Sequence, residues 1–494
     1  MKKLAMGVLG VLLMGAVVTA QGPIRLYTQP PVPNPEILDR LNLKLAWRTY
    51  LPTEGRRDGI FSVQIPERLQ PPGGLVLVQT RSATVIALDS ATGATLWRTR
   101  VGTPYAMRQP LGYNSKQIFV ANGVELYALS RETGEIEWVS TMPHVASSAP
   151  VADEESVFIA LGTGRLYTYQ LPKPGGGAPS PQIVEGRETG PEAGPPVTPA
   201  APLPSYRLST SALGVSGQSV GSVSAVSSMG QSVRSIGPLS SSLESRTGGI
   251  THRPQPQVAW DYVGESRLEL APLVTAEFIL VANYAGTFVA MRKLDGAIQY
   301  RFQATAPLSA PLGQHNNTAY VGSEDYTVSA MDIFGGRILW RFLGAGPIRQ
   351  KPEVTDDSVY IAPERSGLYR LDRETGQTIW RNPTAQRFLS ANTKFVYATD
   401  GGGRLLVLDR GRGTLLGAYD AARDFVVPIV NDMTDRFYLA SNDGLFTCLH
   451  DRDYITPLRM KTVSEIPANA PGSATKSPVA EGADMKKTDK EMGR

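Results

Sequence analysis

The sequence is poor in cysteine and histidine. Cys448 is the one cysteine in 494 residues, so no intrachain disulfide can form and the fold must depend on packing alone. The four histidines, at positions 144, 252, 315 and 450, form no H-x-H or H-x-x-H cluster of the kind that binds metals. Cys448 lies in the apolar segment LFTCL at 445–449, and we interpret it as a small residue packed in a sheet rather than a reactive thiol.

Long hydrophobic runs are also scarce, and the clearest one lies at the N-terminus. The apolar run at 4–18 follows Lys2 and Lys3 and is followed by small residues up to Ala20. It is short for a membrane span and has the flanks of a secretory signal. We predict a signal peptide over 1–20 that is cleaved after Ala20, with an uncleaved anchor as the alternative. The mature protein would be periplasmic or secreted, without an integral membrane span.

A strong charge of either sign is missing as well. The 49 Lys and Arg residues nearly balance the 45 Asp and Glu residues, which gives a formal net charge of +4. Such a balance does not indicate binding of nucleic acid, or of an acidic partner, across the whole surface.

What the sequence does contain is an internal repeat of about 40 residues. An aromatic residue ends an apolar strand at successive steps of 41, 122, 40, 40 and 40 residues. These aromatic positions are Trp97, Trp138, Trp260, Tyr300, Trp340 and Trp380. A proline that opens another apolar strand recurs with the same period, at Pro110, Pro150, Pro272, Pro311 and Pro352. Two independent landmarks with one period establish the repeat.

Each repeat is predicted to form four short antiparallel strands. In the unit that ends at Trp380, the strands are expected at 351–355, 358–362, 367–372 and 377–381. Asp and Gly residues lie between them and suit tight hairpin turns, and the segments themselves are apolar and β-branched. A four-stranded repeat of 40 residues is typical of a propeller blade, so the fold class is all-β.

The repeat count predicts eight blades, with seven as the alternative. A seventh unit at 403–419 has Gly417 where the tryptophan should stand, and an eighth begins at 443–449 without its last strand. The missing strand resembles the segment around Trp47, so we expect the N-terminal segment to complete the last blade. This pairing would close the ring and remove its free edges.

The step of 122 residues contains an insertion. Residues 171–255 replace the last tight turn of the third blade and contain 16 Ser, 13 Gly and 12 Pro, so we predict a disordered loop. The predicted organisation is therefore a signal peptide (1–20), an N-terminal lead (21–42), a first propeller part with the closing strand (43–170), the insertion (171–255), a second propeller part (256–461) and a flexible C-terminal tail (462–494).

The phrase A-x-D-x-x-T-G-x-x-x-W, complete from Ala87 to Trp97, resembles the repeat of the pyrroloquinoline-quinone (PQQ)-like β-propellers. In that family the tryptophan packs between blades and the turn residues fix the hairpin, so the resemblance implies structural roles. The residues that match are Trp47, Asp89, Gly93, Trp97, Gly134, Trp138, Trp260, Gly296, Tyr300, Asp332, Gly336, Trp340, Asp372, Gly376 and Trp380.

Two branches of this superfamily imply different functions. Quinoprotein alcohol dehydrogenases hold PQQ and calcium and typically carry an adjacent Cys-Cys disulfide, often with a haem-binding C-x-x-C-H; a single cysteine excludes both cysteine features. The sequence looks more similar to BamB, a periplasmic scaffold of outer-membrane protein assembly, although the lipidation cysteine of BamB is missing. We therefore expect an exported, non-catalytic scaffold that binds envelope proteins or peptides and has no cofactor. The alternatives are a PQQ- and calcium-dependent dehydrogenase, and an envelope structural component that docks through 171–255.

Candidate binding residues lie in the links between blades. These links should emerge near the centre of the ring on one face, and five different blades contribute basic residues to them. The candidates for binding an anionic partner are Arg108, Arg267, Arg349, Lys351, Arg387 and Arg423. By contrast, we interpret the carboxylate pairs Asp153-Glu154 and Asp356-Asp357 as solvated turn residues rather than an acid/base pair.

Overall fold

The computed structural model describes residues 33–54, 57–66, 74–172, 256–420 and 429–462, together with residues 422, 425 and 427. The predicted signal peptide, the N-terminal lead up to residue 32, most of the predicted insertion and nearly all of the predicted tail lie outside the described residues, and so does Arg423. The chain divides into two compact units, of which one contains all the described residues and the other spans Lys173–Pro254.

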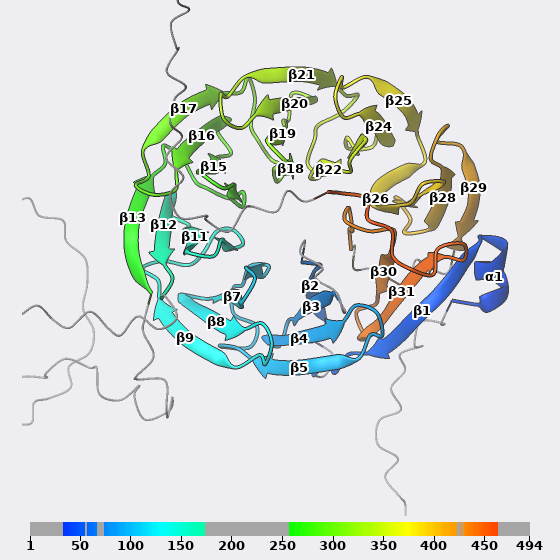
Figure 1. Cartoon of the computed structure of the whole chain (residues 1–494), viewed down its shortest axis with the longest axis horizontal. Coiled ribbons are helices and arrows are strands. Elements are labelled where there is room, and N and C mark those ends of the chain that lie inside the picture. The colour runs from blue at the N-terminus through cyan, green and yellow to red at the C-terminus, as the bar shows by residue number, and fades with distance from the viewer. Residues whose placement is uncertain are drawn as a thin grey trace, which may run out of the picture. The chain divides into compact units, whose positions relative to one another are not determined.

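The described residues form eight small antiparallel sheets that follow one another around a ring (Figure 1). We number these blades from the N-terminal side. The first four are blade 1 with β2 (Ile60–Gln64), β3 (Leu75–Thr80), β4 (Thr84–Asp89) and β5 (Thr95–Arg100); blade 2 with β6 (Gly112–Tyr113), β7 (Gln117–Asn122), β8 (Glu125–Ser130) and β9 (Ile136–Thr141); blade 3 with β10 (Val151–Ala152), β11 (Ser156–Ala160), β12 (Arg165–Gln170) and β13 (Gln257–Val263); and blade 4 with β14 (Leu273–Val274), β15 (Phe278–Ala282), β16 (Thr287–Arg292) and β17 (Ile298–Gln303).

The remaining blades continue this order. They are blade 5 with β18 (Gly313–His315), β19 (Thr318–Gly322), β20 (Thr327–Asp332) and β21 (Ile338–Leu343); blade 6 with β22 (Glu353–Val354), β23 (Ser358–Ile361), β24 (Leu368–Asp372) and β25 (Thr378–Asn382); blade 7 with β26 (Ala385–Ala391), β27 (Phe395–Asp400), β28 (Leu405–Asp409) and β29 (Leu415–Tyr419); and blade 8 with β30 (Phe437–Ala440), β31 (Leu445–Asp451) and β1 (Leu43–Tyr50). The prediction of an all-β, eight-bladed propeller is confirmed.

Blade 8 is assembled from both ends of the described chain, as predicted. β1 pairs antiparallel with β31, and a single bridge between Val427 and Ala440 stands where other blades have an inner strand. The short helix α1 (Pro35–Arg40) precedes β1 and starts at the N-cap residue Asn34, whose side chain accepts a hydrogen bond from the Glu36 amide. Pairing of β1 leaves no open edge between blades 7 and 1.

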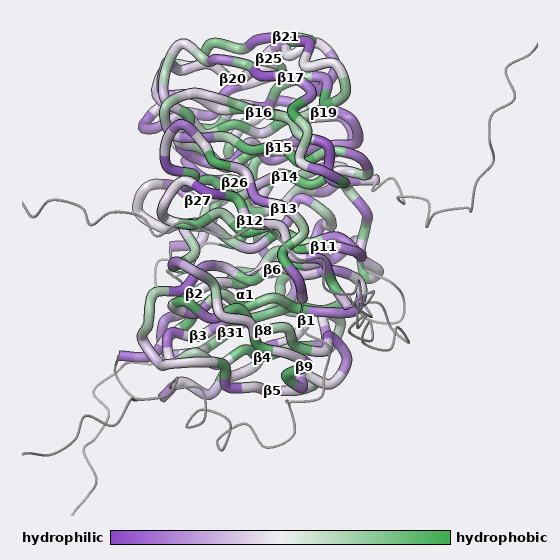
Figure 2. The backbone as a smooth tube through the Cα atoms, turned by 90° about the vertical axis from the view of Figure 1, so that its left-hand side faces the viewer, coloured by the Kyte–Doolittle hydropathy of each residue, from purple (hydrophilic) through white to green (hydrophobic). Residues whose placement is uncertain are grey.

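The hydrophobic cores lie between and within the blades. The second and third strands of each blade are almost entirely buried, because each is covered by a neighbouring blade on both faces. The outer strands β17 and β21 alternate between half-buried and exposed residues, and Figure 2 shows the contrast between hydrophobic β14 and β15 and the more hydrophilic β17 and β21. Within the described ranges, no helix is long and apolar enough to span a membrane.

The strand order gives the ring two different faces. Links from each outer strand to the next inner strand, and hairpins between second and third strands, lie on one face, which we call the link face. Hairpins between first and second strands and between third and fourth strands lie on the opposite face, the turn face. Residues 172 and 256, which flank the insertion, replace such a hairpin and therefore lie on the turn face.

Candidate functional site

The repeat aromatics occupy the seams between blades. Each packs over the turn glycine of the following blade, and that glycine has a positive φ; a Cβ at Gly376, for example, would lie 2.5 Å from the Trp340 ring. The aromatic N–H or O–H also donates to a carbonyl of the same turn, as Trp340 does to Arg373 at 2.9 Å. Six seams share this arrangement: Trp47 on Gly93, Trp97 on Gly134, Trp260 on Gly296, Tyr300 on Gly336, Trp340 on Gly376 and Trp380 on Gly413.

The repeat aspartates hold these turns in shape. Asp89 Oδ1 accepts hydrogen bonds from the amides of Ala91 and Thr92 and from the Thr92 hydroxyl, at 2.7–3.0 Å. Asp372 makes the same three types of bond, and these bonds lower the pKa of its carboxyl group. The carboxylates are thus directed at backbone within their own turns, and the geometry places no ligand-binding group among them.

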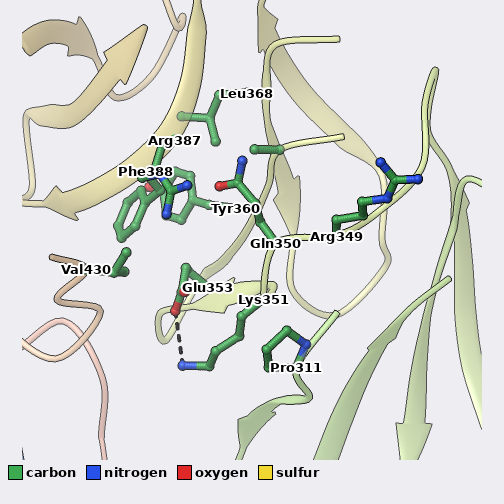
Figure 3. A pocket seen from close by; sticks show the side chains of 11 residues that line it. Pro311, Arg349, Gln350, Lys351, Glu353, Tyr360, Leu368, Arg387, Phe388 and Val430 are labelled. Atoms are coloured by element: carbon green, nitrogen blue, oxygen red, sulfur yellow. Dashed lines mark hydrogen bonds and ion pairs between the residues drawn. The ribbon is translucent and has the colours of Figure 1, made fainter. Parts of the chain in front are cut away.

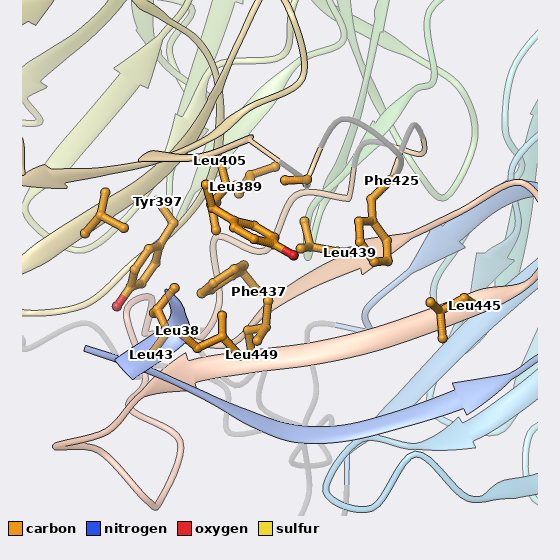
Figure 4. Packing of buried hydrophobic residues seen from close by; sticks show 13 residues of the cluster. Leu38, Leu43, Leu389, Tyr397, Leu405, Phe425, Phe437, Leu439, Leu445 and Leu449 are labelled. Carbon is orange, nitrogen blue, oxygen red and sulfur yellow. The ribbon is translucent and has the colours of Figure 1, made fainter. Parts of the chain in front are cut away.

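The two seams that depart from the repeat are informative. Trp138 is buried at the boundary with blade 3, but its Nε1 has no hydrogen-bond partner among the described residues; most of the segment between β12 and β13, where the other blades have the accepting turn, lies outside them. In blade 7, Gly417 has no side chain, and a Cβ there would collide with Leu41 at the end of α1. Leu38 and Leu43 pack with Leu41 among buried residues of blades 7 and 8 (Figure 4).

The six candidate basic residues do not form one cluster. Arg108 donates to the carbonyls of Thr80 and Arg81 and lies over the Phe61 ring. Arg267 is exposed on the link between blades 3 and 4. Arg423 lies outside the described residues, so its position is not tested.

The other three candidates gather at one place, around a cavity of about 280 Å³ between blades 6 and 7 (Figure 3). Arg349 extends away from the cavity centre toward Glu324 and Glu364, with which it forms ion pairs. Lys351 pairs with Glu353 at 3.2 Å. The Arg387 side chain is half-buried in the cavity wall, and burial lowers its pKa. That these residues bind a partner remains a prediction.

A cluster of buried charges beside this cavity was not predicted. It combines Lys351 and Glu353 with Asp432 and Lys461, which pair at 3.1 Å. Burial raises the pKa of Glu353. Burial alone would raise the pKa of Asp432 too, but Lys351 and Lys461 lower it overall. No sequence signal links the three segments that carry these residues, because Asp432 follows Glu353 by 79 positions, Lys461 follows Asp432 by 29, and all lie outside the repeated phrase.

Lys461 reaches the cluster through a C-terminal strap, which we define as residues 452–462. The Met460 amide donates to the Met433 carbonyl at 2.8 Å, and the Asp356 amide donates to the Met460 carbonyl at 2.9 Å. The Thr462 amide in turn donates to Asp356 at 2.8 Å. The strap therefore ties blade 8 to blade 6 on the turn face and covers Asp432.

The two carboxylate pairs interpreted as solvated turn residues lie in turns, and Glu154, Asp356 and Asp357 are exposed, but Asp153 and Asp357 also join neighbouring blades. Asp153 is only 16% exposed and forms a 2.6 Å ion pair with Lys293 of blade 4. Asp357 binds Arg370 in its own blade and the buried Arg410 in blade 7. The interpretation did not include these contacts between blades, because the first hairpin of one blade lies beside the last hairpin of the next, which sequence spacing does not reveal.

The residues present do not fit a quinone–calcium centre. Calcium takes six to eight oxygen ligands, usually with several carboxylates. No group of three or more Asp, Glu, His or Cys side chains in the described part of the chain is placed to hold a metal ion. The carboxylates of Glu353 and Asp432 are instead compensated by lysines. Cys448 is buried, and burial raises the pKa of its thiol to about 12, so the thiolate form is strongly disfavoured.

The fold and the seams define the class of this protein: a β-propeller built from PQQ-like repeats. A family model described as outer membrane protein assembly factor BamB matches residues 38–173 and 290–448, which is more than half of the chain. The chain belongs to this family. No curated protein matches this sequence.

Solved structures with similar folds include both natural and designed propellers. The structure of BamB from Moraxella catarrhalis is 13% identical, covers 83% of this chain and 97% of its own, and superposes with a TM-score of 0.53. The computationally designed protein Ika8 is 12% identical, covers 82% of this chain and 99% of its own, and has the same TM-score. At such low identity the likeness concerns the fold alone.

Proposed function

We propose that this protein is an exported, non-catalytic scaffold that binds other proteins of the cell envelope and takes part in outer-membrane protein assembly. The observation that carries the proposal is the match to the BamB family, which covers segments in both halves of the ring. The description of that family names outer-membrane protein assembly, and the same membership supports an envelope location.

The geometry supports a binding role over a catalytic one. The repeat residues are engaged in seams and turns, and the buried carboxylates Glu353 and Asp432 are each paired with a lysine. A general acid or base needs a free titratable group within reach of a substrate. A rigid ring with many loops instead offers a broad surface for partners, which is how loops on a fixed scaffold commonly act.

The link face is our choice for the partner-binding surface. It presents exposed side chains that are not needed for the seams, among them Arg267 and Met107, the latter 67% exposed. The boundaries of the insertion and the bound end of the strap at Thr462 lie on the turn face. A partner that approaches the link face would therefore meet loops of the ring itself.

Site-specific photo-crosslinking in the native envelope tests this proposal. A crosslinking amino acid is placed at Arg267 or Met107 on the link face and, as a matched control, at Leu294, which is 85% exposed on the turn face. We expect adducts with outer-membrane assembly proteins from the first two positions and at least fivefold fewer from the third. Equal adducts from all three positions would contradict the choice of face.

Deletion of the gene tests the cellular role. We expect lower amounts of β-barrel proteins in the outer membrane, restored by the wild-type chain. Unchanged barrel levels together with the absence of any envelope-protein adduct would reject the scaffold role. A variant without residues 173–254 distinguishes binding through the ring from docking through the insertion. Loss of all adducts in that variant would favour docking through the insertion.

A further inference from the structure

The cavity between blades 6 and 7 lies in the inner wall of the ring and is lined by both polar and apolar side chains. It lies where the link before β22, the strands of blade 6, the start of β26 and an inner segment of blade 8 meet (Figure 3). Its apolar side is formed by Tyr360, Leu368, Phe388 and Val430. At about 280 Å³ it is below the range of roughly 300–1,000 Å³ that is typical of sites for drug-sized ligands, so it suits a smaller molecule or a single residue.

Two backbone irregularities in β26 flank the residues that line this cavity. The pairing of β26 with β27 shifts between Ala385 and Arg387 and again between Phe388 and Ser390. Arg387 and Phe388 lie between these two shifts, and both line the cavity. Bulges that re-aim side chains are over-represented next to functional sites. β26 is also the longest inner strand of the described blades, with seven residues.

The polar side of the cavity leaves one cation without a partner. Lys351 pairs with Glu353, and the Gln350 amide donates to the Gln386 carbonyl at 3.1 Å. Arg349 is engaged outside the cavity by two glutamates. Arg387, in contrast, makes no hydrogen bond or ion pair with any residue that the structure describes, although Glu353 lies close enough to act on it through space.

A half-buried guanidinium without a partner is unfavourable. Arginine stays charged in proteins, and removing its charge from water costs free energy unless an anion or acceptors replace the water. The partial burial of Arg387 is visible in its lowered pKa, of which burial is the largest cause. A ligand that supplies the missing acceptors would recover this cost.

We infer that the cavity at Arg387 binds one carboxylate that carries an apolar group. The planar guanidinium matches a carboxylate in a two-bond arrangement, and the adjacent Phe388 and Tyr360 rings, which stack with centroids 4.4 Å apart, would cover the apolar group. A single unpaired cation, with the buried Glu353 close by, favours a monoanion over a phosphate. Two sources share this chemistry: a free carboxylic acid and the carboxyl-terminal residue of a peptide.

Isothermal titration calorimetry on the full-length protein tests the inference. The probes are N-acetyl-phenylalanine, which has a free carboxylate, and N-acetyl-phenylalanine amide, which has none. We expect binding of the acid and at least tenfold weaker binding of the amide. Arg387→Gln should weaken binding of the acid at least tenfold, and Arg387→Lys should restore part of it, while Arg165→Gln, at an exposed position of blade 3 that does not line the cavity, is the control and should change it less than twofold.

The outcomes are distinct. Equal binding of acid and amide, no binding of either, or full binding by a folded Arg387→Gln variant would overturn the inference; a thermal melt verifies that the variant is folded. A peptide that ends in phenylalanine identifies the source: tighter binding than the single amino acid indicates a peptide terminus, and weaker binding indicates a free acid. This inference does not depend on the proposed scaffold role, because crosslinking at Arg267 does not involve the cavity.

Discussion

The outer seams and the inner wall of this ring are built on different principles. Six seams use one arrangement, an aromatic residue that packs on a glycine and donates to the carbonyl of a turn. The inner wall of blades 6 to 8 uses unique contacts: two bulges in β26, a buried cluster of charges and a C-terminal strap.

The two regions differ in whether their contacts repeat from blade to blade. Each of the six seams joins two blades of similar shape, so the same residue pattern fits all six. The inner wall has no repeated neighbour, and some of its contacts join blades that are not adjacent, as the bond from Thr462 of the strap to Asp356 of blade 6 does. We therefore expect damage to a seam to cost stability, and damage to the inner wall to change binding or pH dependence.

Removal of a seam aromatic should have the largest effect. Trp380 is 6% exposed and donates to the Arg410 carbonyl at 2.7 Å. Trp380→Ala should lower the free energy of unfolding by about 3–5 kcal/mol, because it leaves a cavity and an unsatisfied carbonyl. Urea unfolding measures the loss. The exposed Leu294→Ala is the control and should be close to neutral; an equal loss in both variants would contradict the role of the seam.

The irregular seam at Gly417 allows a test of a different kind. Gly417→Ala places a methyl group against Leu41, so we expect a loss of about 1–3 kcal/mol from overpacking. The change restores no repeat contact, because α1 already occupies this space.

A double-mutant cycle with Leu41→Ala identifies the partner. The combined variant should lose less stability than the sum of the two single variants, since the smaller side chain makes room for the added methyl group. Additive losses would show that Leu41 is not the group that Gly417 accommodates.

A pair of conservative substitutions compares a regular seam with the one next to the insertion. Trp97 donates to the Arg131 carbonyl at 3.0 Å, whereas the Trp138 N–H has no partner among the described residues. Trp97→Phe should therefore cost about 1 kcal/mol more than Trp138→Phe. Chemical unfolding of both variants measures the difference. A larger cost at Trp138 would indicate that its N–H is bonded in the intact protein.

The smallest expected effect concerns the pH dependence of stability and involves His315 in β18, the inner strand of blade 5. His315 is 3% exposed and contacts Asp356 at 2.8 Å, and burial, the largest cause, lowers its pKa from the ordinary value of 6.5. The neutral form is therefore favoured in the folded state. Its contribution to stability is complete above about pH 6.5 and is lost as the pH falls through the lower folded pKa.

Thermal melts between pH 7 and pH 5 measure this contribution. His315→Gln should reduce the loss of melting temperature over that range, although His450, whose pKa burial also lowers, keeps part of it. His144→Gln changes an exposed residue and is the control. An identical pH dependence in the wild type and in His315→Gln would contradict the assignment.

The sequence was sufficient to predict most of the ring. The spacing of Trp97, Trp340 and similar residues predicted the blades, the segment around Trp47 predicted the closing strand, and the long step located the insertion between β12 and β13. It did not predict that Arg108 would bind backbone, or that Arg349 and Lys351 would be paired with glutamates. Link residues have no repeated environment, so their partners cannot be derived from the repeat.

The sequence by itself therefore determined the number of blades, their order and the seam residues, because those properties follow from a local pattern that each blade repeats. The tertiary structure alone decided that Leu41 fills the place beside Gly417, that Lys461 returns to Asp432, and that Arg387 and Tyr360 share one cavity. The physical reason is the distance along the chain. Closing the ring brings together groups whose spacing carries no period.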